Sequence, residues 1–315
     1  MKYTTLGNSG LVVSRICLGG NSWGSAGRRA WAAMDAAASQ PFFRRALDAG
    51  INFFDTADVY NLGASEEAIG AHLVGAVPRD ELVLCTKVGL PMGPKPNQAG
   101  LGRKHVMASI DASLKRLRTD HVDLYMLHRY DPATPAEEVV ATLADIVRAG
   151  KARHVAASTM RATQLARMQC FARANGLPRF VSMQNLYNLL DRSEEADMIP
   201  FCIEEGIALT PYSPLARGVL SGNRGPGANT QTERAREDKM AAPYMTEAAE
   251  AVVGKVRTVA AAIGAMPSQV ALAWLLHQTG LAAPVVGVTR LDQIDDAAKA
   301  TELSLDAAQL AALSG

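Results

Sequence analysis

The sequence lacks several patterns that mark whole classes of protein. Its formal net charge is only +1, because 32 Lys and Arg balance 31 Asp and Glu, so charge gives no argument for binding nucleic acid or an anionic membrane. No apolar run reaches the ~18 residues that a membrane helix needs. The opening residues, MKYTTLGNSG, contain no apolar stretch of signal-peptide length. We therefore expect no nucleic-acid partner and no membrane association.

Cysteine and metal-binding motifs are also scarce. The four cysteines, Cys17, Cys85, Cys170 and Cys202, form no C-x-x-C pair, and three of them lie in apolar runs. This pattern is typical of reduced thiols in the core of a cytoplasmic protein. There is no H-E-x-x-H segment and no group of carboxylates at metal-ligand spacing, so we expect no metal. No G-x-G-x-x-G follows the first predicted strand, which argues against a Rossmann dehydrogenase.

What the sequence does contain is a regular alternation of short apolar runs and segments of helical period. Most of the apolar runs start roughly 25 to 40 residues apart, the span of one βαβ unit. The predicted strands are RICLGG (15–20), INFFDTA (51–57), LVLCTKV (82–88), VDLYMLH (122–128), RHVAAS (153–158), FVSMQN (180–185), IALTPYS (207–213) and APVVGV (283–288). Between them, sets such as Val139, Leu143 and Ile146 fall on one helix face.

Strands that alternate with helices and are apolar on both faces predict a parallel α/β sheet. Eight of them favour a closed (β/α)8 TIM barrel, one domain over residues 1–315, rather than an open doubly wound sheet. Residues 24–40, 88–102 and 214–244 depart from the alternation. Each follows the C-terminal end of a strand, where barrel active sites are built, so we expect substrate and cofactor loops there, with plain linkers as the alternative.

Polar side chains gather where these strands end. Asp55 ends the second strand, Lys87 the third and His128 the fourth, and Tyr60 lies five residues beyond Asp55. In a barrel these groups meet at one mouth, although each taken alone has a commoner structural role. A phenol has a pKa of about 10, which a neighbouring ammonium lowers. Asp55, Lys87 and Tyr60 therefore suit a tuned general acid, with His128 orienting a carbonyl oxygen.

Several longer segments follow one another in a recognisable order. They are GINFFDTADVYNLGASEEAIG (50–70), TKV around Lys87, DLYMLHRYD (123–131), GKARHVAAS (150–158), MQNLYNLLDR (183–192) and PYSPLARGVLSG (211–222). Together they resemble the aldo-keto reductase superfamily, from the first strand to about Asp296, and most of all its bacterial open-barrel members. The resemblance implies a (β/α)8 barrel, NADPH-dependent reduction of aldehydes or ketones to alcohols, and a catalytic tetrad of Asp55, Tyr60, Lys87 and His128.

The resemblance also implies where cofactor and substrate bind. Ser158 and Gln184 would hold the nicotinamide carboxamide, Tyr212 would stack on its ring, and Arg290 would grip the 2′-phosphate. The full implied cofactor set is Ser22, Trp23, Asp55, Ser158, Thr159, Gln184, Tyr212, Ser213, Pro214, Leu215, Gly218, Arg224, Gly287, Thr289, Arg290 and Gln293. The implied substrate set is Trp23, Tyr60, His128, Arg129 and Tyr130.

Three positions depart from the family pattern and bear on cofactor affinity. Thr159 stands where most members have Asn, and Asn223 stands where many have a phosphate-binding Lys, with Arg224 adjacent. Asp296-Ala297 replaces the usual Glu-Asn, at the adenine contacts. The four residues of the tetrad all match.

The leading hypothesis is a cytoplasmic NADPH-dependent carbonyl reductase that acts on a small molecule with Tyr60 as the general acid. The alternative is an NADPH-binding regulatory module with slow turnover, which keeps the same barrel and tetrad. A metal-dependent barrel lyase or hydrolase is a third reading. Arg129 and Arg224 favour a phosphorylated or acidic carbonyl compound, while a structural role fits Arg129 equally. The sequence predicts no oligomeric state.

Overall fold

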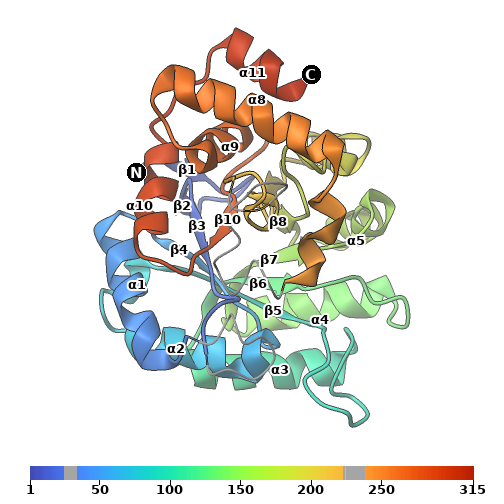
Figure 1. The fold of residues 1–315 in the computed structure, drawn as a ribbon. Coiled ribbons are helices and arrows are strands. Elements are labelled where there is room, and N and C mark those ends of the chain that lie inside the picture. Colours follow the sequence, from blue (N-terminus) through green and yellow to red (C-terminus); the bar gives the residue numbers. More distant parts are fainter. Residues whose placement is uncertain (25–33, 223, 225–237) are drawn as a thin grey trace.

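The computed structural model describes residues 1–24, 34–222, 224 and 238–315, and its centre is a curled sheet ringed by helices (Figure 1). The strand order is β10-β3-β4-β5-β6-β7-β8-β9, and every neighbouring pair is parallel. The strands are β3 (Cys17–Gly19), β4 (Phe53–Asp55), β5 (Val83–Val88), β6 (Val122–Leu127), β7 (Ala152–Ser158), β8 (Phe180–Gln184), β9 (Ala208–Leu209) and β10 (Val285–Gly287). Each lies inside a predicted strand or begins one residue before it.

The two edges of this sheet meet and close it. The amide of Leu209 in β9 donates to the carbonyl of Gly280 at 2.9 Å, just ahead of β10. The amide of Val285 in β10 donates to the carbonyl of Pro211 at 2.8 Å, and a parallel bridge joins Tyr212 to Val285. The predicted (β/α)8 barrel is therefore confirmed.

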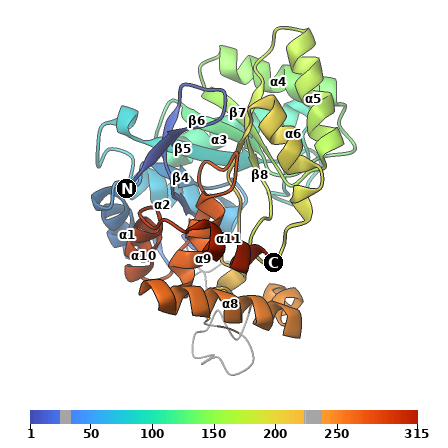
Figure 2. The same cartoon turned by 90° about the horizontal axis from the view of Figure 1, so that it is seen from above.

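Helices cover the outside of the barrel (Figures 1 and 2). They are α1 (Ala36–Asp48), α2 (Ala64–His72), α3 (Arg103–Leu117), α4 (Ala136–Arg148), α5 (Ala162–Ala174), α6 (Met198–Glu205), α8 (Glu247–Ile263), α9 (Pro267–Leu276), α10 (Asp292–Ala300) and α11 (Ala307–Ser314). Helix α4 shows why they form: Val139, Leu143 and Ile146 share one buried face, as predicted. Its first turn carries Glu137 and its last turn Arg148, charges that suit the two ends of the helix dipole.

Apolar side chains fill the barrel and the space around it. Successive strand residues point to opposite faces of a sheet. Phe53 therefore packs inside the barrel with Leu124 and Met126, while Phe54 packs outward under the helices. A further cluster around Trp274 joins α8, α9 and α11, and α8 and α11 lie together outside the barrel in Figure 2.

An N-terminal hairpin covers one end of the barrel. Its strands are β1 (Tyr3–Thr5) and β2 (Val12–Ser14), and Leu6 and Val13 join the cluster inside the barrel. Gly7, between the strands, has a φ of 57°, and a Cβ there would lie 2.6 Å from the carbonyl oxygens of Val181 and Gly206. Only glycine fits so close an approach. Because Val181 and Gly206 lie near the N-terminal ends of β8 and β9, the opposite, C-terminal end of the barrel is where a site can open.

One of the predicted core cysteines lies at the surface. Cys17, Cys85 and Cys202 are buried, but Cys170 is exposed. The buried face of α5 is formed by Leu165, Met168, Gln169 and Ala172. Position 170 points away from that face, so the prediction of a core thiol is wrong for Cys170 alone.

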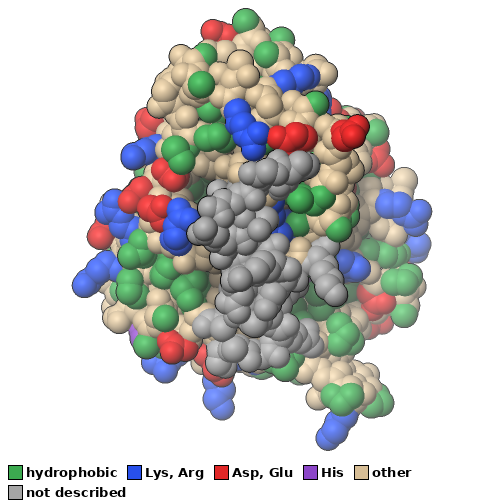
Figure 3. Space-filling model, viewed as in Figure 1, with side chains coloured by type: hydrophobic (Ala, Val, Ile, Leu, Met, Phe, Trp, Pro, Cys, Tyr) green, Lys and Arg blue, Asp and Glu red, His purple; other side chains and the backbone are tan. Residues whose placement is uncertain are grey.

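The described residues form neither a single membrane-spanning helix nor, on the face shown in Figure 3, a surface of one charge sign. No single helix among them is long and apolar enough to cross a membrane; α8 and α9 meet the criterion only as a pair, bent by 98°. Among the coloured side chains in Figure 3, acidic and basic groups are interspersed over the face shown.

Candidate active site

Lys87, near the end of β5, is the centre of a buried hydrogen-bonded cluster. Its Nζ donates to Oδ2 of Asp55 at 2.5 Å, to the carbonyl of Thr56 at 2.9 Å and to Oη of Tyr60 at 3.3 Å. β4 and β5 are neighbours, so Asp55 and Lys87 extend from adjacent strand ends. Lys87 has no exposed surface and Asp55 is 2% exposed. The predicted carboxylate, ammonium and phenol therefore form one connected group.

Tyr60 and His128 complete this group. Tyr60 begins the short 3-10 helix η2 (Tyr60–Gly63), and Lys87 Nζ lies 4.8 Å from the centre of its ring. His128 directly follows β6, and its ring meets that of Tyr60 edge-on, with 5.6 Å between centres and 82° between planes. The four side chains predicted to form the tetrad thus converge at the C-terminal end of the barrel.

The charges of Lys87 and Tyr60 follow from burial and from their neighbours. Burial lowers the pKa of Lys87, but Asp55 and Tyr60 more than offset this, and the pKa ends well above its ordinary value. Burial raises the pKa of Tyr60, and Lys87 offsets only part of that rise. The expected net lowering of the phenol pKa is therefore wrong, because the sequence shows the neighbouring charge but not the burial. Tyr60 keeps its proton at neutral pH, the state that a general acid needs.

His128 is neutral at physiological pH. Burial, aided by the positive charges of Lys87 and Arg129, lowers its pKa to about 3. Its Nδ1 is buried and has no hydrogen-bond partner in the part of the chain that is described. A neutral imidazole donates through one nitrogen and accepts through the other. His128 can therefore donate a hydrogen bond to an oxygen without bringing a second cation beside Lys87.

The residues expected to hold a carboxamide lie at the ends of β7 and β8. Ser158 and Gln184 are paired in the sheet register, and both are buried. Ser158 Oγ lies 3.1 Å from Oγ1 of Thr159. Gln184 Nε2 donates to Oδ1 of Asp55 at 3.0 Å, so its amide also belongs to the cluster around Lys87. These contacts put Gln184 directly beside Asp55, with Ser158 at the end of the neighbouring strand.

Thr159 has a strained backbone. Its φ is 49°, in the left-handed region that β-branched residues rarely adopt. Its amide donates to the carbonyl of Gln184 at 3.2 Å, so the conformation is tied to the end of β8. Asn, the residue that the family resemblance implies here, tolerates this region far better. The departure at Thr159 therefore has a cost in stability that the sequence did not reveal.

We expect Thr159→Asn to raise the free energy of unfolding by about 1 kcal/mol, since it removes left-handed strain. Denaturant titration measures this. The control is Thr163→Asn on the exposed face of α5, where a surface substitution is expected to change stability by no more than about 0.5 kcal/mol. Equal effects at both positions would show that the gain does not come from the backbone at Thr159.

A segment of tight turns that follows β9 carries several of the expected cofactor-binding residues. It contains Tyr212, Ser213, Pro214, Leu215 and Gly218. Ser213 has a φ of 53° and Gly218 a φ of 93°, and the Gly218 amide donates to the carbonyl of Leu215 at 2.9 Å. Asn188 holds this loop from the side, donating from Nδ2 to the carbonyl of Ser213 at 3.1 Å.

Arg224 is buried against an acidic residue. Its Nη1 donates to the carbonyl of Asp238 at 3.3 Å, and Nη2 lies 3.9 Å from Oδ2 of the same residue. Arg217 donates to both Oδ1 and Oδ2 of Asp238, at 3.1 and 3.0 Å. The guanidinium expected to replace a missing phosphate-binding lysine is thus held by Asp238. Asn223 and parts of the predicted loops 24–40 and 214–244 lie outside the described residues.

The segment predicted to hold a 2′-phosphate leads into α10. Gly287 ends β10, and the amides of Thr289 and Arg290 donate to Oε1 of Gln293 at 2.8 and 3.2 Å. Arg290 is exposed and bonds Asp292 through Nε at 3.0 Å and Nη2 at 2.6 Å. Exposed ion pairs of this kind contribute little to stability, so a phosphate can displace the carboxylate.

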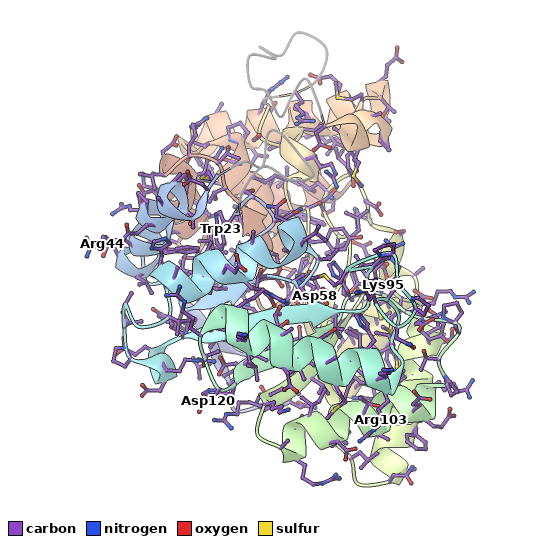
Figure 4. All side chains as sticks on the ribbon, turned by 90° about the horizontal axis from the view of Figure 1, so that it is seen from below. Trp23, Arg44, Asp58, Lys95, Arg103 and Asp120 are labelled. Atoms are coloured by element: carbon purple, nitrogen blue, oxygen red, sulfur yellow. The ribbon has the colours of Figure 1, made fainter. Side chains whose placement is uncertain are left out.

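The predicted substrate residues differ in exposure. Arg129 is exposed and Tyr130 half-buried, directly after His128. Trp23, labelled in Figure 4, is fully buried. Its ring packs edge-on against that of Phe43, with 4.5 Å between ring centres. Ser22, beside it, is buried too.

The segment 88–102 lies against the residues that follow β6. The amide of Leu101 donates to Oδ2 of Asp131 at 2.8 Å, and the amide of Gly100 donates to the carbonyl of Gly89 at 2.9 Å. The segment is therefore closed on itself and anchored next to Arg129 and Tyr130, consistent with the loop position expected from the sequence.

Comparison with known proteins agrees with this arrangement. A sequence model of the Aldo/keto reductase family matches residues 15–315. The chain belongs to the aldo/keto reductase family. It is 36% identical to a versiconal hemiacetal acetate reductase of Aspergillus parasiticus, over 97% of this chain and 94% of that protein. It is 37% identical to a putative aryl-alcohol dehydrogenase of Schizosaccharomyces pombe, over 96% and 92%. An aldo-keto reductase of Alternaria alternata is 36% identical, over 96% and 88%.

Sequence reasoning about this aldo/keto reductase missed two features of the site. The first is the hydrogen bond from Gln184 to Asp55. In a (β/α)8 barrel, side chains from alternate strands share one interior layer, and on this basis a contact between β8 and β4 could have been predicted. The second is Asp58, a buried acid between Asp55 and Tyr60. Its position inside the most specific motif was the available signal.

Proposed function

We propose that this aldo/keto reductase reduces aldehydes or ketones to alcohols with NADPH, and that Tyr60 supplies the proton. The observation that carries the proposal is the position of Lys87, bonded at once to Asp55 and to Tyr60, with His128 against the phenol ring. This arrangement suits an acid that must donate a proton and then exist briefly as an anion beside a fixed cation.

Each residue of the tetrad has its own role in the proposed reaction. When bound, NADPH supplies a hydride to the carbonyl carbon. Tyr60 Oη gives its proton to the carbonyl oxygen, and the phenolate that remains is stabilised by Lys87, which Asp55 keeps in place. His128 is neutral, and its Nδ1 has no hydrogen-bond partner within the described part of the chain, so it orients the same oxygen. Solvent then returns a proton to Tyr60.

The chain's donors fit a nicotinamide nucleotide, the kind of cofactor that this family generally uses. His128, Ser158 and Thr159 lie at the C-terminal ends of β6 and β7, and among the described residues Nδ1 of His128 has no hydrogen-bond partner. Arg290 offers a planar fork of donors before α10, which favours the 2′-phosphate of NADPH over the free hydroxyl of NADH. We also propose a cytoplasmic location, because the free thiols of this chain suit a reducing compartment.

We propose aromatic aldehydes as the first substrates to test, since one relative is named as an aryl-alcohol dehydrogenase. The experiment follows NADPH oxidation with an activated aromatic aldehyde, methylglyoxal and a triose phosphate, with NADH as a control. We expect turnover with at least one carbonyl and faster turnover with NADPH than with NADH. NADPH binding without turnover of any carbonyl would contradict a reductase and favour a regulatory module.

A further inference from the structure

Asp58 is a buried carboxyl that the proposed reaction does not use. It lies between Asp55 and Tyr60, in the segment that joins β4 to η2. It is 1% exposed, and neither of its carboxyl oxygens has a hydrogen-bond partner among the residues that the structure describes. In Figure 4 it lies in the interior, whereas Arg44 and Asp120 lie at the edge of the molecule. A buried, unpartnered carboxyl is rare and costly, so its presence calls for a physical reason.

The surroundings of Asp58 are rigid and already contain a carboxylate. Glu66 of α2 accepts hydrogen bonds from Arg116 Nε at 2.6 Å and from Thr86 Oγ1 at 2.5 Å. Helix α2 lies so close to α3 that a Cβ on Gly70 would sit 2.2 Å from the carbonyl oxygen of Arg116. Glu66 is therefore fixed by its partners and cannot turn away when Asp58 becomes charged.

The backbone of Asp58 also contacts the strand that carries Lys87. Its amide donates to the carbonyl of Lys87 at 3.1 Å, and the charge of Lys87 favours the ionised form of Asp58. On β6, burial raises the pKa of Tyr125, and the charge of Asp58 adds to that rise. The titratable and charged groups around Asp58 are thus Glu66 on α2, Lys87 on β5, Arg116 on α3 and Tyr125 on β6.

We propose that Asp58 is a positioning residue of the reductase site, whose buried, unpartnered carboxyl changes its charge and so alters the field at Lys87 and Tyr60. Its effect on turnover rests on the proposed function, whereas its titration does not. Protonated Asp58 leaves Asp55 as the one carboxylate that competes with the Tyr60 phenolate for Lys87. Ionised Asp58 adds a second negative charge, and the phenolate that forms on proton donation becomes less stable.

The electrostatics of the pocket agree with this role. Burial and then the charge of Glu66 raise the pKa of Asp58 from 3.8 to about 7, although Arg116 and Lys87 offset part of the rise. The Val59 amide also favours the carboxylate, without a hydrogen bond of ordinary geometry. Asp58 is therefore mostly neutral in mildly acidic solution and mostly ionised in mildly alkaline solution.

The first test is the pH profile of kcat/KM for carbonyl reduction by wild type and Asp58→Asn. If ionised Asp58 makes proton donation by Tyr60 about tenfold less favourable at equilibrium, the change equals about one pKa unit. The rate of proton transfer reflects only part of that change, so we expect the wild-type kcat/KM to fall about threefold as pH rises through 7. Asp58→Asn, a neutral isostere, should keep the higher rate across this range. The matched control Asp80→Asn, an exposed acid on the 3-10 helix Arg79–Glu81, should follow wild type. The same fall in Asp58→Asn would overturn the proposal.

A second measurement needs no activity. The pKa of Asp58 in the folded chain lies above 3.8, so this group lowers the stability of wild type as pH rises from about 4 to about 7. The excess of the Asp58→Asn denaturation midpoint over wild type should therefore be smallest near pH 4, grow as pH rises to about 7, and then level off. A difference that does not vary with pH would overturn the proposed titration. A wild type that reduces no carbonyl would overturn the proposed function, while this measurement would still report the titration.

Discussion

A Tyr60→Phe variant is expected to bind NADPH as wild type does, while its kcat for carbonyl reduction falls by about 10²- to 10⁴-fold, the contribution typical of a positioned general acid. Phenylalanine keeps the ring that packs edge-on against His128 at 5.6 Å and lies 4.8 Å from Lys87 Nζ. It loses only the hydroxyl that Lys87 contacts at 3.3 Å. The variant therefore removes the proposed proton donor and leaves the packing of the site in place.

Two measurements separate chemistry from binding in this variant. Quenching of protein fluorescence on NADPH addition gives the affinity, and single-turnover oxidation of NADPH gives the rate of the chemical step. The matched control is Tyr3→Phe, which removes a hydroxyl bonded to the carbonyl of Gly50 at 2.7 Å, on the N-terminal hairpin and away from the site. That control should keep the wild-type rate. A Tyr60→Phe variant with undiminished turnover would show that another group delivers the proton.

The fold and the convergence of the tetrad were predictable because both follow from local patterns. Short, largely apolar runs such as FVSMQN, separated by helical segments, indicate buried parallel strands, and counting them gives the barrel. Strand ends then fix which side chains meet. Asp55 and Lys87 end neighbouring strands, so their contact follows from chain order alone.

The properties that escaped prediction depend on burial and on contacts across the barrel. The pKa of Tyr60 rises because the phenol is buried away from water, and that burial depends on how several strands pack together. The bond from Gln184 to Asp55 joins strands that are not neighbours. The exposure of Cys170 depends on which way α5 rotates on the sheet. The pairing of Arg290 with Asp292 is a rotamer choice that sequence spacing does not determine.

Lys87→Met is expected to give the largest loss of stability of any single change in this site. Methionine keeps most of the volume of the lysine stem but removes an ammonium with no exposed surface. The carboxylate of Asp55 then stays buried and without its cation, although Gln184 Nε2 still donates to it. Breaking a buried pair in this way costs about 3–5 kcal/mol, because a charge is left uncompensated. Equilibrium denaturation gives the free energy of unfolding.

The double variant Asp55→Asn/Lys87→Met distinguishes stability from catalysis. It removes both charges, so the penalty for an unpaired carboxylate disappears and most of the lost stability should return, since neutral replacements of buried pairs are often well tolerated. Turnover should stay as low as in Lys87→Met, because the phenolate of Tyr60 still lacks a cation. Recovery of both properties together would contradict a direct role of Lys87 in proton donation. Recovery of stability alone would mean that the ammonium of Lys87 serves the chemistry at Tyr60, and that Asp55 is there to make a buried ammonium tolerable.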